Sequence, residues 1–195
     1  MKFPISNFKF QIILVFFILG LAYIISPGPN SIDDFPPIPG SVKSNEPGDT
    51  YQVGNIAAYF SDFDRNGITE FYKTAYQNMY FGFILPPVNL NYPPEFAKQA
   101  IRDEQKSTFL KEYVYPLKGS IFVNGYEPFI ENELKNKSHN FIGDHIHING
   151  RYFVSKTTIR YYPANIFAVI FVYFGIWITI YYLIKISRFA MKESL

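Results

Sequence analysis

The sequence predicts an α+β domain, built on an antiparallel sheet with one or two packed helices and flanked by two transmembrane helices. Two long uncharged apolar runs lie near the two ends of the 195-residue chain. Between them, short segments of alternating polarity are separated by turn residues, as in antiparallel sheets. The chain has 17% charged and 19% aromatic residues, which is too few charges and too many rings for a disordered chain or an ordinary soluble domain.

The first apolar run, residues 10–26, is predicted to be a transmembrane helix. It begins FQIILVFFILGLAYII, in which Gln11 is the only strongly polar residue. These residues would span about 24 Å as a helix, slightly less than a bilayer core of roughly 30 Å. A cleaved signal peptide would carry small residues before its cleavage site, whereas this run ends in the bulky Ile24 and Ile25. The sequence therefore favours an uncleaved signal anchor.

The second apolar run, residues 164–185, is predicted to be the other transmembrane helix. Its uncharged stretch IFAVIFVYFGIWITIYYLI would span about 28 Å, which matches the hydrocarbon core. Small residues on one side of this helix would admit a close-packed helical partner, which the first run could supply, although small residues also occur there by chance. The residues of this predicted helix contact are Ala164, Ala168 and Gly175 in the second run and Gly20 and Ala22 in the first.

The charges outside the two runs predict the orientation of the chain. The ends carry five basic residues and one acidic residue, whereas residues 27–163 carry 13 basic and 15 acidic ones. By the positive-inside rule, residues 1–9 and the basic tail 186–195 are cytoplasmic and the central domain is extracytoplasmic. We therefore expect an integral membrane protein that crosses the lipid bilayer twice, with both termini in the cytoplasm.

Residues 27–47 are predicted to form a stiff linker. Six prolines in these 21 residues favour extended conformations and exclude a regular helix or a central strand. The α+β domain is then expected to comprise residues 48–163, which is long enough for a core of its own.

Hydrophobic periodicity predicts the elements of this domain. Residues 68–79 have the spacing of an amphipathic helix, and Asp64 or Asn66 is its natural N-cap. A second helix is expected from Pro94, extending with a break toward Leu110 and exposed because its apolar face is weak. Strands are predicted at residues 51–60, 80–85, 113–117, 120–123, 144–148 and 151–162.

The dipeptide Asn149-Gly150, between the last two predicted strands, predicts a tight hairpin. Both central residues of a type I′ turn take a positive φ, which asparagine and glycine tolerate. The strands on either side are therefore expected to pair antiparallel.

Three histidines within nine residues are the candidate metal ligands. His145 and His147 would lie on the same face of a strand about 7 Å apart, a spacing that can chelate one ion. His139 or a distant carboxylate would have to complete a zinc-type site. The alternative is that the two histidines form the polar face of a hairpin strand whose Ile146 and Ile148 face the core.

Other chemistries are disfavoured. The absence of cysteine excludes thiol catalysis, cysteine-ligated zinc and disulfides. Residues 62–67 begin like a calcium-binding loop, but Lys73 stands where a bidentate glutamate is needed, and helix capping explains the same residues. The sequence has no nucleophile elbow, phosphate loop or H-E-x-x-H helix, so no catalytic residue is assigned. A slightly acidic extracytoplasmic domain also disfavours nucleic acid as a partner.

Two functional hypotheses remain. The first is a non-catalytic membrane-anchored protein without a cofactor, whose extracytoplasmic domain binds a protein partner as an accessory or assembly subunit of a membrane or cell-envelope complex, or forms a homo-oligomer. Its support includes the many tyrosines within the domain, some of which are expected at an interface because each buried hydroxyl needs a partner. The alternative is a zinc-type metal-binding domain or hydrolase that uses His145 and His147.

Overall fold

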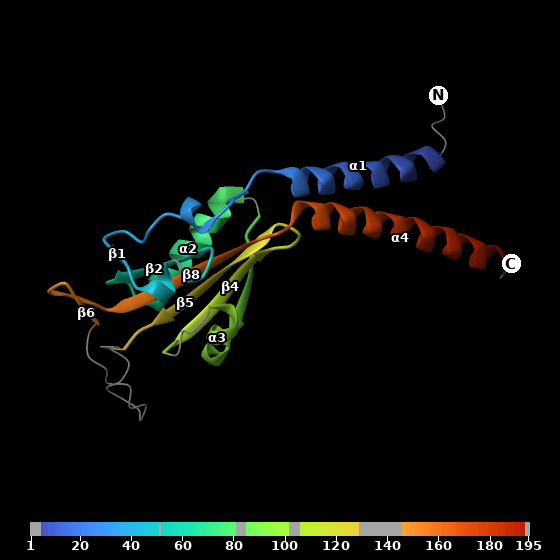
Figure 1. Cartoon of the computed structure of the whole chain (residues 1–195). Coiled ribbons are helices and arrows are strands. Elements are labelled where there is room, and N and C mark those ends of the chain that lie inside the picture. Colours follow the sequence, from blue (N-terminus) through green and yellow to red (C-terminus); the bar gives the residue numbers. More distant parts are fainter. Residues whose placement is uncertain (1–4, 51, 81–84, 102–105, 129–145, 194–195) are drawn as a thin grey trace. The chain divides into compact units, whose positions relative to one another are not determined.

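The structure is a computed structural model of the whole chain, and it divides into two compact units (Figure 1). One unit consists of Met1–Pro27 together with Ala164–Leu195, and the other is Gly28–Pro163. The residues that the structure describes are 5–50, 52–80, 85–101, 106–128 and 146–193.

The first unit consists of two helices, α1 (Ile5–Ile25) and α4 (Ile166–Glu193). Among the described residues, one helix is long and apolar enough to cross a membrane by length and composition, namely α4 over Ile166–Met191. The apolar part of α1, Phe10–Ile25, is shorter. α4 is therefore a candidate membrane anchor, whereas a second span through α1 stays a prediction.

The second unit is built on a six-stranded sheet with the order β1-β2-β8-β5-β4-β3. All of its neighbouring strands pair antiparallel, so the predicted α+β class with an antiparallel sheet is confirmed. Two further strands, β6 and β7, form a separate hairpin. The bounds are β1 Val42–Lys43, β2 Ile56–Ser61, β3 Val88–Tyr92, β4 Phe109–Tyr115, β5 Gly119–Tyr126, β6 Ile146–Ile148, β7 Arg151–Phe153 and β8 Ser155–Pro163.

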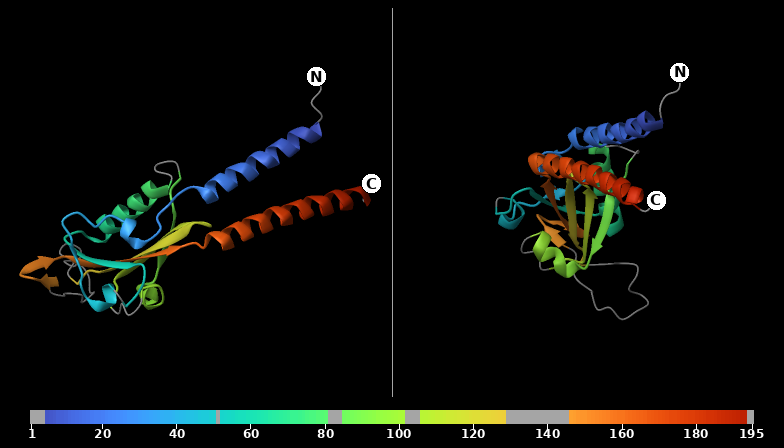
Figure 2. Two further views of the ribbon diagram at one scale, coloured as in Figure 1. Left: turned by 45° about the horizontal axis from the view of Figure 1, so that its top comes forward. Right: turned by 90° about the vertical axis from the view of Figure 1, so that its right-hand side faces the viewer.

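Two helices of unequal length lie on opposite faces of this sheet (Figure 2). α2 (Arg65–Tyr80) covers one face, and the short α3 (Ala97–Ala100), which follows a 3-10 turn, lies over the other. The predicted amphipathic helix is confirmed in α2. Its start is fixed as expected, because the Asp64 carboxylate accepts a hydrogen bond from the backbone N–H of Gly67 at 2.8 Å.

The main core lies between α2 and the sheet and is rich in tyrosine. The Tyr76 ring of α2 lies 5.1 Å from the ring of Tyr115 and 6.2 Å from that of Tyr161. The Tyr113 hydroxyl donates a hydrogen bond to the Thr69 carbonyl at 2.9 Å. Five tyrosines of this core are at most 1% exposed, namely Tyr72, Tyr76, Tyr113, Tyr115 and Tyr161. Core packing therefore accounts for these five tyrosines.

The proline-rich segment predicted as the linker 27–47 contributes to the same core. The Phe35 ring lies 5.8 Å from the ring of Tyr76 and 5.4 Å from that of Tyr161. Three of its apolar side chains are at most 5% exposed, namely Ile32, Phe35 and Ile38. Because burying such side chains removes apolar surface from water, the segment packs as part of the compact unit, which begins at Gly28.

Three predicted elements differ from the structure. The strand expected at 151–162 is divided into β7, in the hairpin, and β8, in the six-stranded sheet. The strand expected at 80–85 is wrong at its start, because Tyr80 is the last residue of α2 and its ring packs 4.9 Å from that of Tyr115. Residues 81–84 of that prediction lie outside the described residues. The helix expected toward Leu110 is also wrong, since α3 ends at Ala100 and Leu110 lies in β4.

The predicted hairpin is confirmed. Asn149 and Gly150 have φ angles of 52° and 79°, and they connect the paired residues Ile148 and Arg151. A two-residue turn with positive φ at both positions is the type I′ geometry expected from the sequence.

Candidate functional site

The face of the sheet opposite α2 carries the candidate binding site. Successive side chains of a strand point to opposite faces. Because Tyr113 of β4 and Val123 of β5 pack into the core under α2, Leu110 and Phe122 on the same strands point the other way. This second face is covered in part by the short α3.

A cleft of about 360 Å³ lies on this second face. Its volume falls within the range of roughly 300–1,000 Å³ that is usual for ligand sites. The Phe122 ring stacks on Tyr92 at 6.2 Å and meets Tyr162 edge to face at 5.4 Å. The lining residues are Tyr92, Phe96, Gln99, Ala100, Leu110, Phe122 and Tyr162. This lining is uncharged and largely aromatic, and it fits an apolar group better than an ion.

Polar contacts outside the lining hold the aromatic walls in place. The Tyr92 hydroxyl donates a hydrogen bond to the Glu112 carboxylate at 2.7 Å, and this bond raises the pKa of Tyr92. The Tyr162 hydroxyl donates to the Ala100 carbonyl at 2.9 Å, at the end of α3. The Arg160 guanidinium donates to the same carbonyl at 3.1 Å and lies 4.6 Å above the Tyr162 ring. The end of α3 is therefore tied to β8 on one side of the cleft.

Exposed apolar side chains adjoin the cleft. Phe96, in the 3-10 turn before α3, is 45% exposed, and its ring lies 6.4 Å from that of Tyr92. Val88 and Leu90 of β3 are also exposed and alternate with two asparagines. Since contiguous exposed apolar surface is typical of interaction sites, the cleft and this rim form one candidate binding surface.

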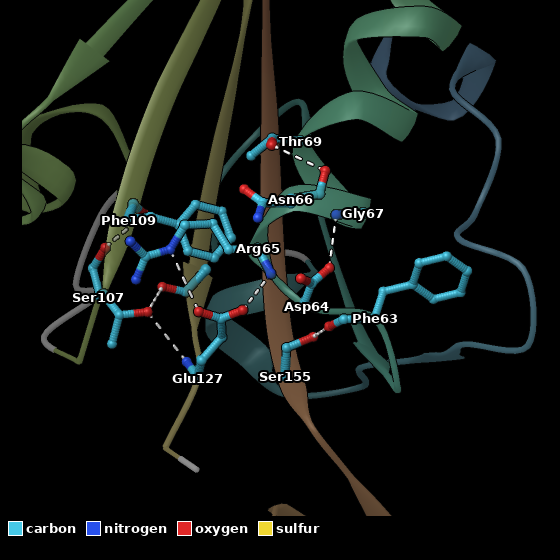
Figure 3. A network of polar contacts seen from close by, with 12 residues as sticks. Phe63, Asp64, Arg65, Asn66, Gly67, Thr69, Ser107, Phe109, Glu127 and Ser155 are labelled. Atoms are coloured by element: carbon cyan, nitrogen blue, oxygen red, sulfur yellow. Dashed lines mark hydrogen bonds and ion pairs between the residues drawn. The ribbon is translucent and has the colours of Figure 1, made fainter. Parts of the chain in front are cut away.

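A second group of polar residues surrounds the start of α2 (Figure 3). The buried Glu127 carboxylate accepts a hydrogen bond from the backbone N–H of Arg65 and lies 3.4 Å from the Arg65 Nε. The Glu127 N–H donates to the Thr108 hydroxyl at 3.3 Å. Burial raises the pKa of Glu127, and the charge of Arg65 opposes this effect. These contacts join α2 to the sheet. The network is therefore interpreted as one that stabilises the fold.

The structure describes one of the three candidate metal ligands. His147 is exposed on β6, and its ring lies 4.7 Å from that of Tyr152. His139 and His145 lie outside the described residues. Within the part of the chain that is described, no three histidine, aspartate or glutamate side chains gather as a metal site. Zinc binding therefore stays a prediction, and so does the expected absence of a cofactor.

The five residues of the predicted helix contact have different surroundings in the structure. Gly20 lies against Tyr173 of α4, because a Cβ added at Gly20 would lie 2.8 Å from the Tyr173 hydroxyl. That hydroxyl donates a hydrogen bond to the Phe17 carbonyl of α1. Of the other residues, Ala164 is half-buried, and Ala22, Ala168 and Gly175 are exposed. A close-packed partner on the small-residue face of α4 stays a prediction.

The cleft could not be read from the sequence. Its lining comes from four strands, the 3-10 turn and α3, which meet through a sheet register that the hydrophobic pattern does not reveal. The sequence feature that could have indicated the cleft is the segment NYPPEF, in which Tyr92 and Phe96 lie on either side of Pro93-Pro94-Glu95. The chain matches no protein-family model, no curated protein and no solved structure.

Proposed function

We propose that this protein is a non-catalytic, membrane-anchored binding protein whose α+β domain receives an apolar segment of a protein partner in the aromatic cleft. The observation that carries the proposal is the uncharged cleft of about 360 Å³, with Phe96 exposed at its rim. Aromatic side chains are enriched at protein interfaces, and pockets of this kind accept the anchoring side chains of a partner. A role as an accessory or assembly subunit of a membrane complex is consistent with such a site.

The proposal includes a two-pass topology with both termini in the cytoplasm and the domain outside it. α4 is long and apolar enough to cross a bilayer, and α1 carries a shorter apolar stretch. The basic residues near the two ends of the chain favour cytoplasmic ends. An extracytoplasmic domain would then meet partners in the cell envelope or at the membrane surface.

The binding proposal is tested first by photo-cross-linking of the full chain in its native membrane. Gln99 is exposed and lines the cleft, so a photo-reactive amino acid at this position is expected to cross-link one defined protein. The same amino acid at Glu70, exposed on α2 on the other face of the sheet, is the matched control and should give no such product. Equal products from both positions would contradict the proposal.

The second step measures affinity for the protein identified in this way. Phe96→Asp places a charge at the rim of the cleft and is expected to weaken binding at least tenfold. Phe63→Asp changes another exposed phenylalanine, which does not line the cleft, and should bind as the wild type does. Equal affinities of the two variants would show that the cleft is not the binding site.

The topology is tested by cysteine labelling, which needs no prior substitution because the chain has no cysteine. A cysteine in place of the exposed Asn45 should react with a membrane-impermeant maleimide in intact cells. A cysteine appended after Leu195 should react only after the membrane is permeabilised. The opposite pattern would reverse the orientation, and reaction of both sites would contradict a membrane span by α4, which lies between them.

A further inference from the structure

Strand β3 lies at one edge of the sheet and presents an open side. Its strand partner among the described residues is β4, and β3 is the last strand in the sheet order. In an antiparallel pair, alternate residues point their N–H and C=O groups away from the partner strand. Val88 and Leu90 are 50% and 39% exposed, so this edge is also accessible from the side of its apolar residues.

The two edges of the sheet differ in how they are protected. Exposed edges are commonly guarded by short length, by charged side chains or by proline. The opposite edge strand, β1, has two residues and carries Lys43. β3 has five residues, VNLNY, and none of them is charged. Within the described part of the chain, its protection is confined to its ends, where Pro86-Pro87 and Pro93-Pro94 flank it and limit any added pairing to the strand itself.

The sequence of this edge is self-complementary. The segment PPVNLNYPP reads almost the same in both directions about Leu90. Two β3 strands paired antiparallel about Leu90 would set Val88 opposite Tyr92 and Asn89 opposite Asn91. Apolar side chains would then meet on one face of the sheet and amides on the other, where amides can hydrogen-bond across the strands. A twofold interface requires this kind of match of a surface with itself.

The charges near the edge permit such pairing. Glu112 and Lys111 of β4 lie beside Leu90 and Asn91 in the sheet register. In a β3-to-β3 pair, the two β4 strands would be three strand spacings apart, about 14 Å. This separation exceeds the Debye length of about 8 Å at physiological ionic strength, so like charges on the two copies would be largely screened.

We propose that the domain pairs with a second copy of itself through β3, which joins two sheets into one continuous antiparallel sheet. Residues opposite each other in an antiparallel pair point to the same face, so the two aromatic clefts would open on the same side. A strand of about 17 Å provides less than the roughly 1,200 Å² buried by stable complexes, so the pairing depends on the high local concentration of chains held in one membrane.

The test uses the full chain in lipid vesicles, with single cysteines introduced into a sequence that has none. Leu90→Cys would place two cysteines directly opposite each other, with a Cα separation of about 4.5–5.5 Å that suits a disulfide. Oxidation should therefore convert most of this variant into a covalent dimer. Val88→Cys is the matched control, because it lies on the same strand and is more exposed, yet its two copies would be about 14 Å apart.

A second measurement does not depend on oxidation. Leu90→Lys would place two ammonium groups next to each other at the centre of the interface and should lower the dimer fraction in vesicles at least tenfold, as counted by single-molecule photobleaching. Val42→Lys, at the opposite edge of the sheet, should leave the dimer fraction unchanged. A monomeric wild-type chain, or equal cross-linking by Leu90→Cys and Val88→Cys, would overturn the proposal. Adding Phe96→Asp to the Leu90→Cys variant should leave its disulfide cross-linking unchanged. A failure of pairing through β3 would therefore not imply a failure of partner binding in the cleft, and the reverse also holds.

Discussion

The two faces of the six-stranded sheet are made by the same strands but are closed to different degrees. On one face, a helix of 16 residues and the proline-rich segment cover a core in which Tyr76 and Tyr115 are at most 1% exposed. On the other, a helix of four residues leaves Phe122 and Tyr162 partly exposed in a cleft. Alternation along a strand supplies apolar side chains to both faces, so the extent of the covering elements decides which face is core and which is available for binding.

The largest expected effect tests whether the proline-rich segment is needed to close the covered face. Phe35→Ala removes a ring that packs on Tyr76 and Tyr161, and we expect it to lower the free energy of unfolding by about 3–5 kcal/mol. Urea unfolding of the full chain in detergent, followed by circular dichroism, measures the change. Phe63→Ala, at an exposed position, should cost less than about 1 kcal/mol. Similar losses for the two variants would mean that the segment is a free linker.

Alkaline pH should destabilise the protein through Tyr113, which is buried under the covered face. Burial of Tyr113 raises its pKa to about 12, although the side chain of Thr69 opposes the shift. Between about pH 10 and pH 12 the unfolded chain loses this proton while the folded chain keeps it, so stability falls as the pH rises. This side chain alone accounts for about 2–3 kcal/mol across that window. Urea unfolding at several pH values measures the slope.

The control for the pH prediction is Tyr113→Phe, which removes the titrating hydroxyl but keeps the ring. Its stability should depend less steeply on pH than that of the wild type above about pH 10. If both proteins have the same slope, Tyr113 does not contribute, and the alkaline destabilisation would arise from the other buried tyrosines of the core.

Truncation of a ring on the cleft face should destabilise the protein less than Phe35→Ala does on the covered face. Phe122→Ala removes a half-buried ring from the wall of the cleft, so we expect a loss of about 1–2 kcal/mol in the free energy of unfolding. The same urea experiment measures it beside Phe35→Ala. A loss equal to that of Phe35→Ala would remove the distinction between the two faces.

The smallest expected effect is a gain in stability. The Tyr72 hydroxyl is buried under α2 and has no hydrogen-bond partner among the described residues. Tyr72→Phe removes this group and should raise the free energy of unfolding by up to about 1 kcal/mol, because an unpaired buried hydroxyl is costly. Tyr113→Phe at neutral pH is the opposite case and should cost about 1 kcal/mol, since its hydroxyl donates to Thr69. A loss in Tyr72→Phe as large as this would indicate a bound water at Tyr72.

Patterns of neighbouring residues predicted the elements that form through contacts close in sequence. The spacing of apolar residues identified α2, and Asn149-Gly150 identified the hairpin between β6 and β7. The aromatic segment that begins at Tyr80 has high strand propensity, but Tyr80 remains helical because its ring packs on Tyr76 one turn earlier and on Tyr115 of the sheet. Contacts across the sheet therefore override propensity at this point.

The elements that form the candidate sites depend on long-range contacts. β3 was not predicted, because VNLNY is short and lies between prolines, and its role as an edge strand follows from its register with β4. Proline content indicated that residues 27–47 are extended, which does not reveal that Phe35 would be buried beside Tyr161, far along the chain. The cleft could not be predicted for the same reason, since its walls come from segments that are distant in sequence.

One contact of the core has a mechanical consequence. The Tyr161 hydroxyl, close to the end of β8, donates a hydrogen bond to the Pro29 carbonyl at 3.0 Å and meets the Tyr80 hydroxyl at 2.9 Å. These two contacts of Tyr161 therefore form a clasp between the segments where the chain enters and leaves the domain. A pulling force applied to Gly28 and Pro163 would load this clasp together with the last pairs of the ladder between β5 and β8, Gly119 with Pro163 and Ser120 with Tyr162. The open edge at β3, two strands beyond β5 in the sheet order, lies outside this path of force.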